Sequence, residues 1–230
     1  MMQVLTFFSN SLLANIPESE YLRFQPHLET VILYKGQTLF EIGQQPKNVY
    51  FPAGAIVSML VDLTEGTSIE INVIGRTSMV GVAAMDRPSF YRATVRSTGL
   101  AYRMPTSVLK HEAMNCPVYT YAAQSDMCKL MAQMAQTMAC GRHHSTENQI
   151  IRWFLITLDH SLTSVIKITQ QEVADLLGFR REAVALALKK LVIRGHVELS
   201  RGQIEILNRP ALEKASCDCY WIHQERARTV

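Results

Sequence analysis

Residues 168–193 contain the pattern of two short helices separated by one glycine, and this pattern constrains the fold more than any other part of the chain. Thr169 and Glu172 have the spacing of a capping box, in which each side chain accepts a hydrogen bond from the other residue's backbone N–H. Gly178 permits the tight turn after this first helix. The second helix should span Arg180–Ile193. Its buried face should consist of Val184, Leu188 and Leu191.

A β-hairpin and a cluster of basic side chains accompany this helix pair. Two short β-type runs, Val197–Leu199 and Ile204–Leu207, flank the turn Arg201-Gly202. Residues 1–141 carry ten basic and ten acidic side chains, so the net charge of +3 arises entirely from the rest of the chain. A local basic cluster is what binding to a phosphate backbone requires. The segment predicts a winged helix-turn-helix that binds DNA; core packing or an adaptor that contacts proteins is the alternative.

Glycines divide residues 27–105 into short runs of β-forming residues. Many short strands at spacings of roughly ten residues predict a β-sandwich or a rolled barrel. The strands should include Ile56–Val61, Ile69–Ile74, Ala93–Ser97 and Leu100–Met104. In the second of these, Glu70 and Asn72 alternate with isoleucine and valine, which predicts one solvent-exposed face.

Residues 106–160 change to a helical pattern with a methionine stripe. Only Asp126 and Lys129 are charged between residues 113 and 141, so a helix here cannot be solvated on all sides. The stripe has heptad spacing and predicts a two-stranded dimer seam, with a core helix as the alternative. The predicted seam residues are Met127, Met131, Met134 and Met138. Gly141 would end this helix as a C-cap and hinge.

The order of these segments resembles the Crp/Fnr family of bacterial transcription regulators. The resemblance covers nearly the whole chain and is sharpest in Ile168–Leu191, which follows the family pattern I-T-x-x-E-[IV]-A-x-x-[LIV]-G-x-x-R-E-x-V-x-x-x-L-x-x-L. It implies an α+β fold with a cyclic-nucleotide-binding-like β-roll sensor domain (1–107), a dimerisation helix and hinge (108–144) and a winged helix-turn-helix domain (145–230). A narrower group in the family is also similar, through Val49–Pro52, Cys140–His144, Arg152-Trp153 and Cys217–Tyr220.

The resemblance also implies which residues contact DNA. Arg181 and Glu182 match the first two base-reading positions, and Arg can pair with guanine while Glu can accept from the cytosine amino group. Leu186 stands where many members carry a second reading Arg, so the operator should differ from the best-known consensus. Thr169 matches a phosphate contact. The full predicted set is Thr169, Gln171, Arg180, Arg181, Glu182, Leu186, Lys189 and Arg201.

The sensor domain lacks the signatures of two familiar effectors. Family members that bind cyclic nucleotides carry a Gly-Glu turn and an Arg-[Ser/Thr]-Ala pair, whereas this chain has Gly81-Val82-Ala83 and Tyr91-Arg92-Ala93-Thr94. Val82 cannot accept from a ribose hydroxyl, and an unpaired buried hydroxyl costs about 1–3 kcal/mol. No Cys precedes Cys116, so the N-terminal iron–sulfur ligands of the Fnr branch are missing. We therefore expect an effector other than cyclic nucleotide at the candidate pocket residues Gly81, Val82, Tyr91 and Arg92.

Cysteine and histidine residues near the hinge and the C-terminus are candidates for a metal or redox site. Thiolate and imidazole are ligands that zinc and iron prefer. The spacings match no standard structural zinc motif, and Cys often acts as a small buried residue. The sequence therefore predicts a packed hinge without metal, and a metal- or redox-responsive regulator as the alternative. The candidate ligands are Cys140, His143, His144, Cys217 and Cys219.

Other function classes find less support in the sequence. A metal-dependent β-barrel enzyme needs several His on its strands, but residues 27–107 contain only His27. No Gly-x-Ser-x-Gly, phosphate-loop or His-Glu-x-x-His motif occurs, so we do not expect an enzyme. Five cysteines and the lack of a charged N-terminal signal before Arg23 predict a cytoplasmic protein with no membrane contact. The expected partners are double-stranded DNA, a second copy of the chain and, for an activator, RNA polymerase.

Overall fold

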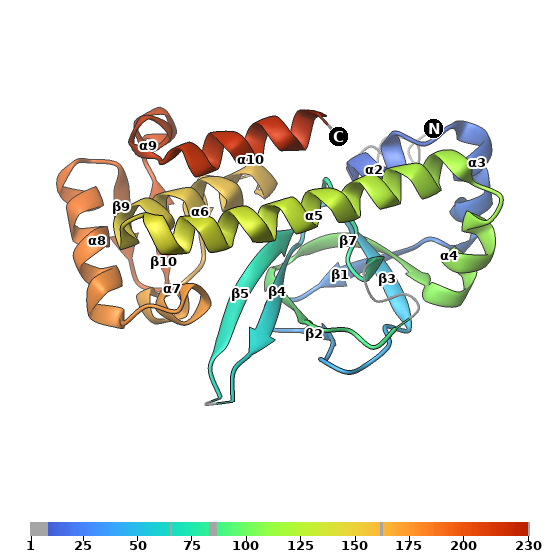
Figure 1. Cartoon of the computed structure of the whole chain (residues 1–230), viewed down its shortest axis with the longest axis horizontal. Helices are drawn as coiled ribbons and strands as arrows, with labels where there is room; N and C mark the ends of the chain where they lie inside the picture. Colours follow the sequence, from blue (N-terminus) through green and yellow to red (C-terminus); the bar gives the residue numbers. More distant parts are fainter. Residues whose placement is uncertain (1–8, 65, 83–86, 162, 230) are drawn as a thin grey trace. The chain divides into compact units, whose positions relative to one another are not determined.

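The computed structural model describes residues 9–64, 66–82, 87–161 and 163–229, which form two compact units. The first comprises Met1–Val61 and Asn72–Met131, and the second comprises Asp62–Ile71 and Ala132–Val230. The predicted α+β class is confirmed: a β-roll precedes the long helix α5 (Pro117–His143), and a winged helix follows it (Figure 1). Because α5 contributes residues to both units, the predicted three-part division at residues 107 and 144 stays a prediction.

Two antiparallel sheets build the β-roll. The first has the order β1-β7-β3, with β1 (Glu29–Leu33), β7 (Gly99–Pro105) and β3 (Asn48–Pro52). The second has the order β2-β6-β4-β5, with β2 (Thr38–Phe40), β6 (Arg92–Ser97), β4 (Ile56–Asp62) and β5 (Ser68–Ile74). The four strands located from the sequence are confirmed, whereas β1, β2 and β3 have no clear alternation that would have located them.

The predicted exposed face of β5 is wrong. Glu70 and Asn72 are only 6% and 8% exposed. Each has a specific partner: the indole N–H of Trp153 donates to Glu70 Oε1 at 2.7 Å, and Asn72 Nδ2 donates to the Leu130 carbonyl at 3.2 Å. The alternation along β5 is present, but Glu70 and Asn72 face hydrogen-bond partners and not water. These hydrogen bonds remove most of the free-energy cost of burying the two side chains.

The long helix α5 begins under a buried carboxylate. Short helices α2 (Ser11–Ala14), α3 (Glu18–Phe24) and η1 (Gln25–His27) precede β1, and α4 (Thr106–Ala113) follows β7. Glu20 on α3 accepts from the first N–H groups of α5, at Val118 (3.0 Å) and Tyr119 (2.8 Å). Negative charge at a helix N-terminus satisfies free donors and stabilises the helix dipole.

The far end of α5 differs from the prediction. Gly141 does not end the helix, which continues to His143, and Gly141 is absent from the described glycines with positive φ. The predicted C-cap at Gly141 is therefore wrong. The sequence was misleading here because a glycine followed by basic residues is typical of a helix C-cap, yet the same pattern also occurs inside a helix.

The C-terminal unit is organised around α6 (Thr146–His160), which packs against three later helices. It contains β8 (Val165–Ile166), α7 (Gln170–Leu177), α8 (Arg181–Ile193), β9 (Val197–Ser200), β10 (Gln203–Ile206), α9 (Arg209–Ala215) and α10 (Asp218–Thr229). The packing partners of α6 are α8, α9 and α10. The small sheet has the order β8-β10-β9. Among the described helices, none is long and apolar enough to cross a membrane.

We predict that Asp126 on α5 makes the protein less stable as the pH rises. Asp126 is 5% exposed, and it accepts hydrogen bonds from Ser78 Oγ (2.6 Å) and the Met79 N–H (3.3 Å). Burial raises the pKa of its carboxyl from 3.8 to about 6. The folded state therefore holds the proton more tightly than the unfolded state, so this contribution is complete below pH ~3.8 and is lost as the pH rises through about 6, amounting to about 3 kcal/mol.

Denaturant unfolding at several pH values would measure this effect. Asp126→Asn resembles the protonated carboxyl, so the variant should lose most of the fall in stability over this pH range and should be more stable than wild type at neutral pH. An unchanged pH dependence in Asp126→Asn would show that this carboxyl is not the responsible group.

Candidate nucleic-acid interface

The first helix of the helix-turn-helix begins and ends as the sequence predicts. Thr169 Oγ1 accepts from the Glu172 N–H at 3.1 Å, and Glu172 Oε2 accepts from the Thr169 N–H at 2.7 Å, so both halves of the capping box of α7 are present. Gly178 follows the helix with φ +70°, in the left-handed region that favours glycine. These two local features fix the bounds of α7 and the turn into α8.

The second helix, α8, buries one face and exposes the other. The predicted core residues Val184, Leu188 and Leu191 are all 0% exposed. Arg180 is the N-cap of α8 and not its first helical residue, a difference of one position from the prediction. The outer face presents Arg181, Glu182, Leu186 and Lys189, all of them exposed. Leu186 is the apolar member of this face and is 59% exposed.

The basic residues of this segment fall into two groups. Lys190 and Arg194 both face α6, where Lys190 Nζ lies 3.6 Å from Glu147 Oε2 and Arg194 forms an ion pair with the same carboxylate. The remaining four are exposed, and no ion pair involves them within the described part of the chain. These four, which we call the free basic group, are Arg180, Arg181, Lys189 and Arg201. Among the described basic residues of this segment, the free basic group is the part without an ion-pair partner, whereas Lys190 and Arg194 share the single negative charge of Glu147.

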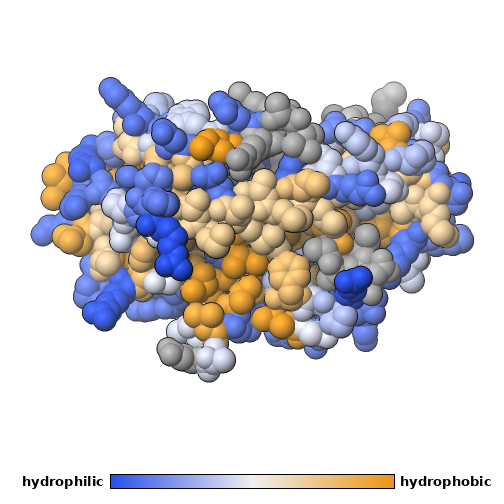
Figure 2. All heavy atoms as spheres, viewed as in Figure 1, coloured by the Kyte–Doolittle hydropathy of each residue, from blue (hydrophilic) through white to orange (hydrophobic). Residues whose placement is uncertain are grey.

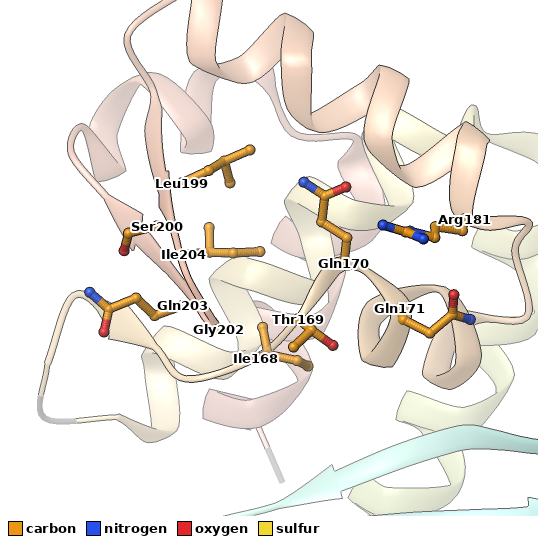
Figure 3. A pocket seen from close by; sticks show the side chains of 10 residues that line it. All are labelled: Ile168, Thr169, Gln170, Gln171, Arg181, Leu199, Ser200, Gly202, Gln203 and Ile204. Carbon is orange, nitrogen blue, oxygen red and sulfur yellow. The ribbon is translucent and has the colours of Figure 1, made fainter.

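A hairpin of β9 and β10 forms the wing, and a hollow lies between it and the helices (Figure 3). The turn of the wing is Arg201-Gly202, with Gly202 at φ +75°. Figure 3 shows that the side chains of Gln170 and Arg181 approach one another on the helix side of the hollow, while Ser200 and Gln203 lie on the wing side. The hollow therefore has polar groups along both borders.

The N-terminus of α7 opens into this hollow. The Gln170 and Gln171 N–H groups belong to the first turn of α7 and have no intrahelical acceptor. Beside them stand the Thr169 hydroxyl and the Arg181 guanidinium. Positive charge together with free N–H groups at a helix N-terminus suits an anion such as a phosphate. The sequence named Thr169, Gln171 and Arg181 but missed Gln170, Ser200 and Gln203, since only the packing of the wing against α7 brings these three to the hollow.

Comparison with known proteins agrees with this geometry. Residues 149–215 match the model of the Crp-like helix-turn-helix domain. The C-terminal part of the chain therefore contains a Crp-like helix-turn-helix domain. The β-roll that precedes this domain has the fold of the N-terminal domain of Crp/Fnr-type structures.

Solved Crp/Fnr structures share the fold at low sequence identity. A protein described as a Crp/Fnr regulator from Eubacterium rectale is 18% identical, with 90% of this chain and 97% of that chain covered and a TM-score of 0.69. FixK2 from Bradyrhizobium japonicum is 15% identical (83% and 98% covered, TM-score 0.68). A CRP-family regulator from Thermus thermophilus is 18% identical (80% and 95% covered, TM-score 0.66). A search of curated protein sequences finds no match.

The predicted effector residues of the β-roll lie next to a buried tyrosine or include it. Tyr91 is 1% exposed, and its hydroxyl hydrogen-bonds the Gly81 backbone, while burial raises its pKa. Val82 is also buried, and Arg92 Nε lies 3.6 Å from Glu41 Oε2. Ala83 lies outside the described residues. An apolar Val82 and an Arg92 that faces a carboxylate agree with the expectation of an effector other than a cyclic nucleotide, which stays a prediction.

The structure also brings four of the five candidate metal ligands together. Cys140 on α5, His144 just after it, and Cys217 and Cys219 at the start of α10 form what we call the Cys/His group. Their ligand atoms all lie within 4.8 Å of one another. His143, the fifth candidate, is exposed and outside the group. Sequence spacing could not predict that these residues lie close together, because more than seventy residues separate Cys140 and His144 from Cys217 and Cys219.

Proposed function

We propose that this protein is a sequence-specific transcription regulator that binds a pseudo-palindromic DNA operator as a homodimer. The observation that carries the proposal is the outer face of α8, where exposed basic side chains without internal partners stand beside a wing. Lys190 and Arg194 both pair with a carboxylate of the chain, whereas the free basic group has no such partner among the described residues. Such uncompensated charge is the electrostatic footprint of nucleic-acid binding.

Base reading would come from the first turns of α8. Arg181 and Glu182 are exposed at the N-terminal end of the helix, the part that enters the major groove in helix-turn-helix proteins. Arg can form two hydrogen bonds to guanine, and Glu can accept from the cytosine amino group. Leu186 is exposed on the same helix and has only apolar surface to offer, which suits a thymine methyl group.

Phosphate contacts would flank the reading helix on two sides. The hollow at the N-terminus of α7 is lined by Thr169, Gln170 and Gln171, whose side chains Figure 3 labels. The backbone N–H groups of this first turn have no intrahelical acceptor. Lys189 lies two turns along α8 from Arg181, and Arg201 lies at the tip of the wing. These groups would fix the position of the protein on the duplex without reading its sequence.

The homodimer would form through the outer face of α5. Figure 2 shows a band of apolar side chains along this helix. The heptad-spaced methionines of this helix are exposed to different extents: Met131 and Met138 are 63% and 70% exposed, Met127 is 37% exposed and Met134 is partly exposed. A 27-residue helix is about 40 Å long, enough for several heptad layers. The 3.5-residue periodicity favours a second α5 as the partner. In knobs-into-holes packing, each methionine side chain inserts between side chains of a facing helix that has the same repeat.

We predict that Arg181→Ala changes which operator bases are preferred. Removing the guanidinium should weaken specific binding by about 1–3 kcal/mol and relax the preference for one guanine in each half-site. Selection from a randomised operator library, run in parallel on wild type and Arg181→Ala, would measure both effects. Identical base preferences in the two proteins would show that Arg181 does not read bases and that α8 is not placed in the groove as we propose.

The neighbouring residues Lys189 and Lys190 provide a matched test of phosphate binding. Lys189→Ala should weaken binding to all sequences alike and flatten the plot of log K against log salt by about one unit for each phosphate that the variant no longer neutralises. Lys190→Ala should leave this slope unchanged, because Lys190 faces Glu147. Fluorescence anisotropy over a salt series would measure the slopes. Equal effects of Lys189→Ala and Lys190→Ala would contradict the distinction between the free basic group and the residues paired with Glu147. Wild-type binding without steep salt dependence would instead favour a protein adaptor.

We also predict that the double variant Met131→Asp, Met134→Asp is monomeric. Two carboxylates in the seam would face their own copies across the two-fold axis, and burying unpaired like charge costs several kcal/mol. Tyr34→Asp is the control, since Tyr34 is 61% exposed but lies outside α5. Sedimentation velocity would compare the three proteins. A double variant that stays dimeric would show that α5 is not the interface.

A further inference from the structure

The Cys/His group has the donor atoms and the spacing of a site for a single tetrahedral metal ion. The Cys140 and Cys217 sulfur atoms lie 3.8 Å apart, and Cys219 Sγ lies 3.4 Å from His144 Nδ1. Around a tetrahedral zinc ion with Zn–S of about 2.3 Å and Zn–N of about 2.1 Å, sulfur atoms lie about 3.8 Å from each other and about 3.6 Å from nitrogen. Both separations agree with the structure to within a few tenths of an ångström.

The surroundings of the group suit a closed site. Cys140, Cys217 and Cys219 are 1%, 8% and 5% exposed. Three sulfurs and one imidazole make a complete set of four protein ligands, the arrangement of structural zinc sites, whereas catalytic sites keep one position open. The amide of Gln136 donates to Cys219 Sγ at 3.1 Å, and such a donor stabilises negative charge on a thiolate ligand.

A buried guanidinium provides a second, independent indication. Arg152 on α6 is 6% exposed; its Nη2 donates to Thr137 Oγ1 at 3.2 Å, and its Nε has no hydrogen-bond partner among the described residues. Within that part of the chain, Arg152 forms no ion pair with a carboxylate, and its electrostatic partners are the three cysteines of the Cys/His group. A buried charge is costly unless an opposite charge compensates it. Neutral thiols provide no such charge, whereas thiolates do.

We propose that the Cys/His group binds one divalent metal ion of the zinc class, which holds the end of α5 and the start of α10 together beside Arg152. On binding, Cys140, Cys217 and Cys219 each release a proton to solvent while His144 coordinates as a neutral ligand. Three negative thiolates and one doubly positive ion leave a net charge of −1. The positive charge of Arg152 then makes the whole assembly neutral.

Competing chemistries fit these positions less well. A disulfide between Cys140 and Cys217 would use two sulfurs and leave Cys219, His144 and the charge of Arg152 without a role. In an iron–sulfur cluster the four protein ligands are distributed over two or four irons, so as a set they must stand farther apart than around one ion. The short separations in the Cys/His group therefore favour a single ion.

The metal content of the full-length protein, purified without chelators and under reducing conditions, tests the proposal. We expect one zinc-class ion per chain by elemental analysis. After chelation, added Co²⁺ should bind once per chain and give the intense visible absorption of tetrahedral cobalt–thiolate coordination. Cys219→Ser should weaken cobalt binding at least about 100-fold, and Arg152→Gln, which removes no ligand, about 10- to 100-fold. Cys128→Ser is the matched control, because Cys128 is exposed on α5 outside the Cys/His group, and it should bind as wild type does.

A measurement on wild type alone covers the case in which a variant fails to fold. Bound metal should protect the three cysteines of the Cys/His group from an alkylating reagent, and chelation should expose them, while Cys128 reacts in both states. Reduced protein that binds neither zinc nor cobalt would overturn the proposal, as would cobalt binding unchanged in Cys219→Ser. Iron found together with inorganic sulfide would show an iron–sulfur cluster in place of a single ion. A Cys140–Cys217 disulfide in anaerobically purified protein would show a disulfide site in place of a metal site. None of these measurements involves DNA, so a failure here is distinct from a failure of the proposed operator binding.

Discussion

The scarcity of charged side chains on α5 constrains what each face of this helix can pack against. Between residues 117 and 141 the helix carries only Asp126 and Lys129 as charged side chains, and water cannot cover such a surface on every side at low cost. One face therefore packs within the N-terminal unit, where Asp126 and Leu130 are buried and the Leu130 carbonyl accepts from Asn72. The methionine face stays exposed in a single chain, and the partner that we propose for it is a second copy. Cys140, near the end of the helix, is again buried and belongs to the Cys/His group.

Features encoded by neighbouring residues were predictable from the sequence. The capping box at Thr169, the turn at Gly178, the buried face of α8 and the wing hairpin all depend on residues within a few positions of each other, and all are confirmed. Local chemistry decides such features because the interacting groups are already close along the chain. The same reasoning places the free basic group on exposed positions, although its contacts with DNA stay predictions.

Features that depend on distant partners were missed or misread. The exposed face predicted for β5 failed because Trp153 and Leu130, far away in the sequence, supply the hydrogen bonds that allow Glu70 and Asn72 to be buried. The basic cluster near α8 is likewise not all alike, since Glu147 on α6 forms ion pairs with both Lys190 and Arg194. The Cys/His group likewise matches no linear motif, because two helix ends that are distant in the chain contribute its halves.

Helix α6 connects the two candidate sites of the C-terminal unit. Glu147 in its first turn holds Lys190 and Arg194 at the end of the reading helix, and Arg152, five residues later, lies beside the thiols. A ligand that binds only the folded form stabilises that form by RT ln(1 + [L]/Kd), about 4 kcal/mol at a thousandfold excess over Kd. Metal in the Cys/His group would thus stabilise the packing of α5, α6 and α10 on which the position of α8 depends. Arg152 would contribute to this stabilisation, because metal-bound thiolates beside it would lower the cost of burying its charge.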